Sequence, residues 1–303
     1  MPNSEATIRR VPASLQEYAG DKQFATTLAR GMELLRCFTP EQPVLGNKDL
    51  AQKLGLPAAT VSRLTYTLMC MGYLAQTEHY GKYQLGSAVL SLGYPLLAQF
   101  TLRRQARPLM LELAEATGGS ISIGIRDRLT IVYIEAVRSF NKRIYPLEVG
   151  TSHSIAGTAI GRAYLMSCRP PEREALLNQI QVKSPLDWQK YGAKLMENLQ
   201  QYPRDGCCVS VGEVYADVQA VAVPLGRIDR GELAAINCSF QGRELDETWL
   251  RQRIAPAMAS SNRGIDASAT IPRSRNCQTI SRTRACTISS ANSRIGNATR
   301  NLA

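Results

Sequence analysis

Small polar and basic side chains gather on one face of a stretch in the first third of the chain. From Ala58 to Met71, apolar residues recur at helical spacing, and the opposite face carries alanine, hydroxyl, arginine and tyrosine side chains. Arginine can donate two parallel hydrogen bonds to guanine, a hydroxyl can bond a base or a phosphate, and an alanine methyl can meet the methyl of thymine. The candidates for contact with DNA bases are Ala59, Thr60, Ser62, Arg63 and Tyr66.

Two side chains farther along the chain, Tyr80 and Lys82, flank the tip of a predicted hairpin. We expect them to hold backbone phosphates rather than to read bases. Two alternatives stay open for the first group. Arg63 could contact phosphate alone, and Tyr66 could pack beneath the hairpin.

A second candidate site comes from two predicted strands in the other half of the chain. Because side chains alternate between the two faces of a strand, Ala235, Asn237 and Ser239 share one face, opposite larger apolar residues. On the preceding strand, Ala220 and Ala222 also share a face of small side chains. Small and hydrogen-bonding side chains on neighbouring strands indicate the floor of a cavity for a small molecule. The alternative is a small-residue face that only packs against a helix.

Residues suited to covalent catalysis or metal binding are sparse. The chain has eight cysteines without Cys-x-x-Cys spacing and two histidines, His79 and His153, around which no ligand set forms. It lacks the sequence patterns of serine hydrolases, zinc peptidases, P-loop proteins and dinucleotide-binding folds. Cys207 and His153 could be proposed as a nucleophile pair, but nothing orients either one. We therefore expect no enzymatic activity, no metal and no cofactor.

Charge and hydropathy limit the partners and location of the protein. The 303 residues carry a formal net charge of +11 with a pI of about 9.4, which favours polyanionic partners. Seven arginines and one aspartate lie between Ala259 and Ala303, so more than half of this charge is at the C-terminal end. No apolar run is long enough to cross a membrane and no signal peptide is visible. We expect a cytoplasmic protein with reduced thiols and no membrane partner.

Two short helices and a hairpin are predicted to position the first candidate site. A helix over 47–54 is followed by Gly55, which suits the left-handed end of a helix, and by Pro57, which suits the start of the next. With strands over 73–77 and 82–85, this order is typical of a winged helix-turn-helix, whose second helix enters the major groove.

Apolar spacing also predicts which helix faces are buried in this domain. A preceding helix over 25–38 should cover the pair with Leu28, Met32 and Leu35. The expected buried residues of the second helix of the pair are Val61, Leu64, Leu68 and Met71.

The rest of the chain changes from helical to strand periodicity. After Gly86, an apolar helix with a kink or break at Pro95 should link two domains and pack on a partner chain, although it could instead fold back on its own domain. Predicted strands then alternate with helices, which favours an α+β domain built on one mostly antiparallel sheet. The strands are expected over 121–125, 129–137, 207–211, 218–225 and 232–240, and a last helix over 246–258.

Both halves of the chain resemble the IclR family of bacterial transcription regulators. In the first half, the resemblance is carried by LARGMELLRCF (28–38), DLAQKLGLPAATVSRLTYTL (49–68), GYL (72–74) and YQLG (83–86). In the second half, it is carried by VGTSHSIAGTAIGRAYL (149–165), the run over 205–213, and QAVAVPLG and GELAAINCS within 219–239. Matches to two domains in the right order are more specific than a helix-turn-helix alone.

The patterns and the resemblance together divide the chain into five segments. The predicted segments are a flexible arm (1–23), a winged helix-turn-helix DNA-binding domain (24–87), a linker helix (88–107), an effector-binding domain (108–258) and a disordered, atypical tail (259–303). Family members usually continue with an amphipathic helix where this arginine-rich tail begins. A shifted reading frame or a basic tail that touches DNA would each account for the difference.

The resemblance also implies ligand contacts and partners. It places effector contacts at Ser210, Ala220, Asn237 and Ser239, and at His153, Ala159 and Ile160 in a loop that closes over the ligand. Backbone N–H groups at a helix start suit a carboxylate, so the expected effector is a small organic or aromatic acid. The implied function is a homodimeric or tetrameric regulator on a pseudo-palindromic operator in double-stranded DNA, with an operator affinity that the effector modulates. The alternative is a ligand sensor whose winged module docks protein rather than DNA.

Overall fold

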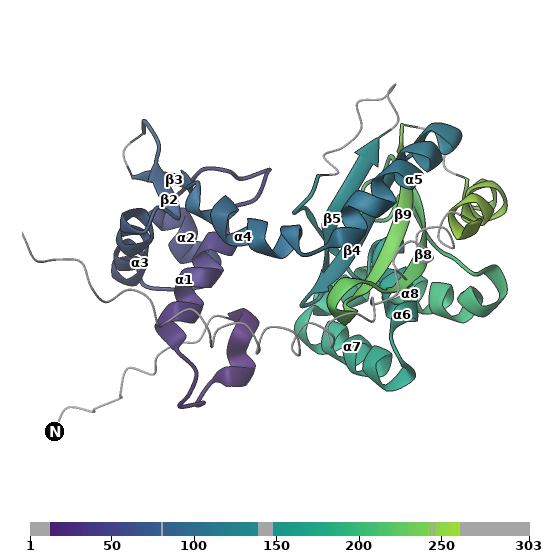
Figure 1. Cartoon of the computed structure of the whole chain (residues 1–303). Helices are drawn as coiled ribbons and strands as arrows, with labels where there is room; N and C mark the ends of the chain where they lie inside the picture. Colours follow the sequence, from purple (N-terminus) through teal and green to yellow (C-terminus); the bar gives the residue numbers. More distant parts are fainter. Residues whose placement is uncertain (1–12, 80, 139–147, 243, 245, 261–303) are drawn as a thin grey trace, which may run out of the picture.

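A computed structural model describes residues 13–79, 81–138, 148–242, 244 and 246–260, which form two parts joined by helix α4 (Figure 1). None of the helices in these residues is both long and apolar enough to span a membrane. The first part contains η1 (Ala13–Tyr18), α1 (Thr26–Arg36), β1 (Leu45–Gly46), α2 (Asn47–Leu54), α3 (Ala58–Cys70), β2 (Leu74–Gln76) and β3 (Lys82–Leu85). The chain continues with α4 (Ala88–Ala98), α5 (Thr101–Thr117), β4 (Ser120–Asp127), β5 (Thr130–Arg138), β6 (Ser152–Ser154), α6 (Ala159–Ser167), α7 (Pro170–Lys183) and α8 (Pro185–Asp205). It ends with β7 (Cys208–Val211), β8 (Val218–Arg227), η2 (Asp229–Gly231), β9 (Leu233–Gln241), α9 (Glu247–Trp249) and η3 (Leu250–Ile254).

The first part packs three helices against a small sheet with the order β1-β3-β2. Gly55 ends α2 in the left-handed conformation, with φ of 63°, and α3 begins directly after Pro57. Leu34 of α1, Leu50 of α2 and Val61 of α3 are fully buried in one core. The predicted winged helix-turn-helix is confirmed.

The apolar face predicted for α1 is wrong at two of its three positions, and the third, Leu35, packs against the core. Leu28 and Met32 are 66% and 43% exposed, while Leu34 is buried against α2 and α3. Met71, predicted on the buried face of α3, follows the end of that helix and is 58% exposed. Thr65 is buried instead, and its hydroxyl donates to the side chain of the first residue of α2 at 3.3 Å. Helical spacing alone does not decide which of two overlapping stripes faces the core, because a polar residue with a partner can be buried too.

The segment between the two parts is two helices rather than one. α4 passes through Pro95 without ending, and the break falls after it, where Phe100 is buried. Asp229 then caps α5, because its Oδ1 accepts from the Thr101 hydroxyl at 2.5 Å and its Oδ2 from the Leu102 N–H at 2.8 Å. Residues 101–107, predicted as part of the linker, therefore lie in a helix whose apolar face packs in the core of the larger part.

The larger part is built on a six-stranded antiparallel sheet with the order β6-β5-β4-β9-β8-β7. α5 and the C-terminal turns α9 and η3 cover one face, and α6, α7 and α8 cover the other (Figure 1). The predicted alternation in β9 holds, because Ile236 and Cys238 lie in the core on the α5 face while Ala235 lies in the core on the α6 face. The α+β fold is confirmed.

Two ion pairs connect the two parts at the turn between β4 and β5. Arg36 Nη1 lies 2.8 Å from Asp127 Oδ2, and Arg128 Nη2 lies 2.7 Å from Glu33 Oε1. The hydrogen bond with Glu33 raises the pKa of Arg128, whose backbone is left-handed with φ of 55°. β5 begins after this turn and contains Tyr133, so the turn joins the winged domain to a strand of the site described next.

Candidate functional site

α3 presents the predicted base-contacting side chains on its outer face. Ala59, Ser62 and Arg63 are exposed, Thr60 is half-buried, and Tyr66 is 67% exposed. The exposure of Tyr66 rules out the alternative that it packs beneath the hairpin. The geometry leaves Arg63 able to reach either a base or a phosphate.

In the hairpin, Lys82 forms an ion pair. Its Nζ lies 2.8 Å from Asp49 Oδ2, and the same oxygen accepts from the Gly46 N–H at 2.9 Å. The hydrogen bond from Lys82 lowers the pKa of Asp49. Lys82 thus ties β3 to the start of α2, and a phosphate would have to compete with Asp49 for it. Tyr80, the other predicted phosphate contact, lies outside the described residues.

Replacing Asp49 with asparagine should raise the affinity for DNA of any sequence, because Lys82 is released to bind a phosphate. The slope of log affinity against log salt should steepen by about 0.9, the value for one more phosphate contact. Lys82→Ala should leave the wild-type slope unchanged. Fluorescence anisotropy with a random-sequence duplex over a salt series measures all three proteins. A slope that becomes shallower by about 0.9 in Lys82→Ala would instead mean that Lys82 already binds phosphate in wild type.

A small cavity of about 50 Å³ lies between the larger sheet and the start of α6. Six of the seven side chains expected to contact an effector line it: His153, Ala159, Ser210, Ala220, Asn237 and Ser239. The seventh, Ile160, is fully buried in the apolar core beside Gly124 and is not part of the described lining. The other lining residues are Tyr133, Thr158, Val214, Tyr215, Val218 and Phe240.

The cavity floor and the strand beside it contain buried polar atoms without a partner in the described part of the chain. Asn237 Nδ2 donates to the Tyr133 hydroxyl at 3.3 Å, while Asn237 Oδ1 is buried and makes no hydrogen bond. On the adjacent strand, Ser122 pairs in register with Asn237 and Ser120 with Ser239. Both hydroxyls are also buried without a partner among the described residues, but neither side chain belongs to the cavity lining. Each such group costs about 1–3 kcal/mol, a cost that a bound molecule or water would relieve.

The described cavity lining contains no aspartate, glutamate, lysine or arginine side chain. Burial lowers the pKa of His153 to about 4, and its ring packs on that of Tyr133 with centroids 4.5 Å apart. Burial also raises the pKa of the Tyr133 hydroxyl. Thr158 is the N-cap of α6 and accepts from the Gly161 N–H at 3.3 Å. The start of α6 carries a positive partial charge, so this end of the cavity suits an anionic group.

The low pKa of His153 predicts a loss of stability in mild acid. The pKa of His153 is about 4 in the folded protein and 6.5 in the unfolded chain, so the unfolded chain takes up a proton at a higher pH. The contribution of neutral His153 to the free energy of unfolding is therefore fully present above pH 6.5 and is lost as the pH falls toward 4. Between pH 7 and pH 5 this residue should lower the free energy of unfolding by about 2 kcal/mol. His153→Gln should lose correspondingly less over the same interval. Urea titrations of both proteins at the two pH values measure the difference, and equal losses would contradict the shift.

The sheet separates the cysteine and histidine considered as a nucleophile pair. Cys207 lies in the core on the α5 face, while His153 lines the cavity on the other face. Burial raises the pKa of Cys207, and it raises that of Cys208 to about 12. Both thiols are therefore protonated at neutral pH, which disfavours a thiolate nucleophile. The described residues bring together no group of three histidine, cysteine or acidic side chains that could hold a metal.

Several cavity residues carry no signal in the sequence. Tyr133 reaches the cavity through a bulge between Ile123 and Gly124 that shifts the register of β4 against β5, which alternation alone does not show. Val214 and Tyr215 approach from a loop that has no periodic pattern.

Comparison with known proteins agrees with both halves of this description. The model of the IclR helix-turn-helix domain matches residues 27–78, and that of the bacterial transcriptional regulator IclR C-terminal region matches residues 95–267. The chain is 31% identical over 264 residues to the HTH-type transcriptional regulator TsaQ1/TsaQ2 of Comamonas testosteroni. The aligned region covers 86% of this chain and 94% of that protein. It is 25% identical over 270 residues to the Pca regulon regulatory protein of Pseudomonas putida, with 87% and 92% covered. An IclR family transcriptional regulator from Brucella abortus has a crystal structure that matches with a TM-score of 0.74 and 37% identity, over 83% of this chain and 94% of that one. The chain belongs to the IclR family of bacterial transcriptional regulators.

Proposed function

We propose that this regulator acts in the cytoplasm, binds a pseudo-palindromic operator as a dimer or a dimer of dimers, and changes its operator affinity when a small organic acid occupies the cavity. The observation that carries the ligand part is the cavity itself. Residues from five strands and from the start of α6 converge there on one space, and the buried Asn237 Oδ1 at its floor has no partner among the described residues. Such unpaired groups are typical of sites that bind a ligand.

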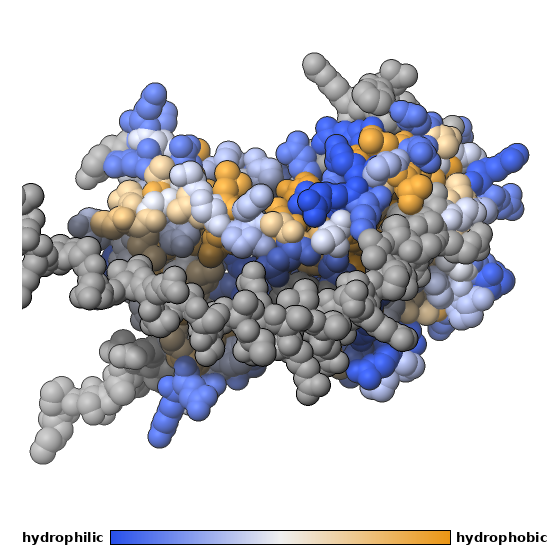
Figure 2. Space-filling model, in the orientation of Figure 1, coloured by the Kyte–Doolittle hydropathy of each residue, from blue (hydrophilic) through white to orange (hydrophobic). Residues whose placement is uncertain are grey.

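An unpartnered apolar helix supports self-association. In the single chain α4 has no buried residue, and Leu90, Leu92 and Tyr94 are 78%, 57% and 70% exposed. Figure 2 shows apolar surface along the segment between the two parts. Leu28 and Met32 of α1 add exposed apolar side chains in the winged domain. A surface of this kind favours burial against a second copy, and two copies would place two α3 helices on neighbouring half-sites.

The chemistry of the cavity supports an acid as the effector. The start of α6 suits a carboxylate, while hydroxyl, amide and neutral imidazole groups suit the rest of a polar molecule. An IclR homologue from Microbacterium hydrocarbonoxydans has been solved in complex with 4-hydroxybenzoate and matches this fold with a TM-score of 0.59 and 19% identity. Aromatic acids are therefore the first compounds to test.

Two binding measurements test this function. A thermal-shift screen with small carboxylates, including 4-hydroxybenzoate, should identify a compound that raises the melting temperature. That compound should then change the mobility shift of DNA from the region upstream of the protein's own gene. Failure to bind any DNA with salt-dependent affinity would favour the alternative, a winged module that docks protein.

Arg63→Ala should lower the affinity for operator DNA by about 1–3 kcal/mol if the side chain reads a base. The exposed position of Arg63 on α3 allows this contact, and the loss should be confined to the specific sequence. Anisotropy titrations with operator and with a random duplex separate the two roles. An equal loss on both duplexes would assign Arg63 to phosphate binding.

A further inference from the structure

The cavity is too small for the class of ligand proposed above. Its volume is about 50 Å³, whereas an engineered protein cavity that binds benzene measures about 150 Å³. An organic acid of that size can enter only if one wall of the cavity moves.

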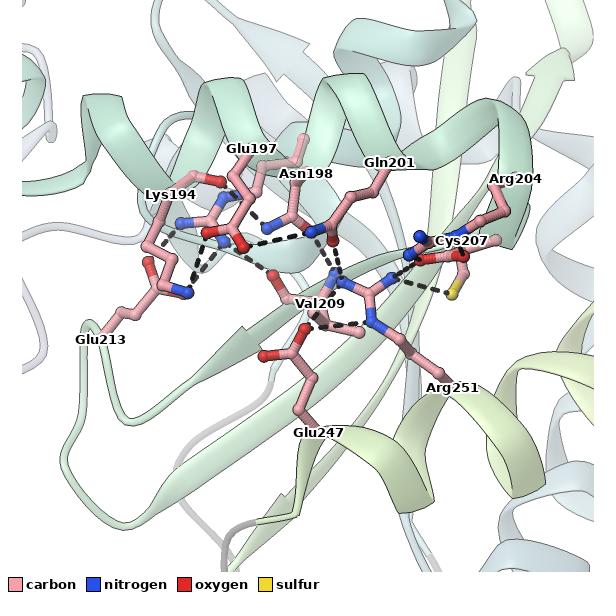
Figure 3. Close-up of polar contacts among 12 residues, drawn as sticks. Lys194, Glu197, Asn198, Gln201, Arg204, Cys207, Val209, Glu213, Glu247 and Arg251 are labelled. Carbon is pink, nitrogen blue, oxygen red and sulfur yellow. Dashed lines mark hydrogen bonds and ion pairs between the residues drawn. The ribbon is translucent and has the colours of Figure 1, made fainter.

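Three of the walls are fixed by their surroundings. β8 and β9 lie inside the sheet, between β4 and β7. α6 packs directly on the backbone of Ile155, with no room for a side chain at Gly161. A side-chain carbon there would lie 2.2 Å from the Ile155 carbonyl oxygen. β7 is held on α8 through Val209, whose N–H donates to Asn198 Oδ1 at 2.7 Å (Figure 3).

A fourth wall carries Tyr133 of β5 and His153 of β6, two strands that pair with each other in the sheet. The last wall is the loop over 212–217, between β7 and β8. Its side chains Val214 and Tyr215 line the cavity. Val214 packs closely on Gly157, where an added side-chain carbon would lie 2.9 Å from Val214 Cγ2. The loop begins at Gly212, which has a left-handed backbone with φ of 65° and can act as a hinge.

A buried ion pair holds this loop against the cavity. Arg162 of α6 is 0% exposed and pairs through both of its terminal nitrogens with the carboxylate of Glu213, at 2.9 Å from Nη1 to Oε1. The same guanidinium donates from Nε to the Ala156 carbonyl at 3.1 Å and from Nη1 to the Val209 carbonyl at 2.7 Å. Arg162 therefore joins three segments that each carry cavity residues. Glu213, with a side chain 16% exposed, is the half of the pair that can reach water.

We propose that residues 212–217 form a lid over the cavity and that the Arg162–Glu213 pair is its latch, a proposal that rests on the cavity being the effector site. Arg162 and Glu213 are positioning residues, because neither lines the described cavity. When the lid turns outward about Gly212, Glu213 leaves the guanidinium, Val214 leaves Gly157, and the cavity widens. The work of separating the pair is subtracted from the affinity of any ligand that needs the open state.

The latch can be tested on the full-length protein without a ligand or DNA. Ala220→Cys places a thiol in the cavity, and its reaction with iodoacetamide, mapped by mass spectrometry, reports how often the lid opens. Glu213→Gln keeps the size of the side chain and removes its charge. It should speed this labelling by about tenfold, since the closed state loses stability relative to the open one. Native Cys238 is an internal control, because it is fully buried on the opposite face of the sheet and reacts only if the domain unfolds.

Two further variants keep the outcome decisive. Glu172→Gln makes the same chemical change in an exposed ion pair with Arg169 and should leave the labelling rate at the wild-type value. Val214→Ala removes the contact with Gly157, keeps the latch, and should also speed labelling. The proposal is overturned if the introduced thiol reacts at the unchanged rate in both Glu213→Gln and Val214→Ala, or if Cys238 gains in step with it. None of these measurements uses DNA or an effector. Failure of the lid proposal can therefore be distinguished from failure of the proposed function.

Discussion

Replacement of Glu213 by alanine should lower the free energy of unfolding more than replacement of Arg162 by methionine. In the first variant Arg162 stays fully buried and loses its anionic partner, and breaking a buried ion pair in this way costs about 3–5 kcal/mol. In the second, Glu213 can turn its partly exposed carboxylate toward water. The loss is then mainly that of two hydrogen bonds, to the carbonyl groups of Ala156 and Val209, each with a net contribution of about 0.5–1.5 kcal/mol.

Tryptophan fluorescence measures this difference in the effector-binding part alone. The two tryptophans of the chain, Trp188 and Trp249, lie in α8 and α9. Urea titrations followed at their emission give the free energy of unfolding of wild type and both variants. Glu172→Ala, which removes an exposed ion pair, should unfold as wild type does. Equal losses in the two variants, or a larger loss for Arg162→Met, would contradict the assignment of Arg162 as the half of the pair that cannot reach water.

Local patterns predict the parts of this protein that depend on neighbours in sequence. Gly55 and Pro57 mark the turn between α2 and α3, and strand alternation places Asn237 and Ser239 on the face where the cavity lies. These features follow from backbone geometry that a few adjacent residues determine. Alternation alone does not show which face of a strand meets a cavity. The small, hydrogen-bonding side chains on one face indicate it, and the resemblance to the IclR family implies that the effector binds there.

The features that the sequence does not reveal depend on contacts between distant segments. Arg162 and Glu213 are 51 residues apart, and nothing in either segment marks them as partners. Ile160 follows Ala159 directly, yet the first turn of α6 directs Ile160 into the apolar core and Ala159 toward the cavity. The resemblance indicates a loop that does reach the cavity, and helix geometry decides which of its side chains faces the space.

Ala220→Leu should abolish effector binding. Ala220 pairs in register with Ser239 on one side and with Ser210 on the other, so its side chain lies at the centre of the cavity floor. Three added carbon atoms would fill a space of about 50 Å³, and overpacking of this kind costs about 1–3 kcal/mol of stability. Calorimetry with the acid found in the thermal screen measures the binding. Gel shifts without ligand should stay at the wild-type value, because α3 belongs to the separate winged part.

Asn237→Ala tests whether Asn237 contacts the ligand or only packs in the fold. The two roles predict different changes in melting temperature and in ligand affinity. Without ligand, Asn237 Oδ1 is buried with no partner among the described residues, and its removal relieves about 1–3 kcal/mol while the bond to Tyr133 is lost. The two changes offset each other, so the melting temperature should stay near the wild-type value or rise. With ligand, the same substitution removes the group that the ligand satisfies, and affinity should fall by about 0.5–3 kcal/mol. If Asn237 served only in packing, the substitution would show the reverse: a lower melting temperature and an unchanged affinity. In that case the side chain would contribute to the stability of the fold and not to ligand binding.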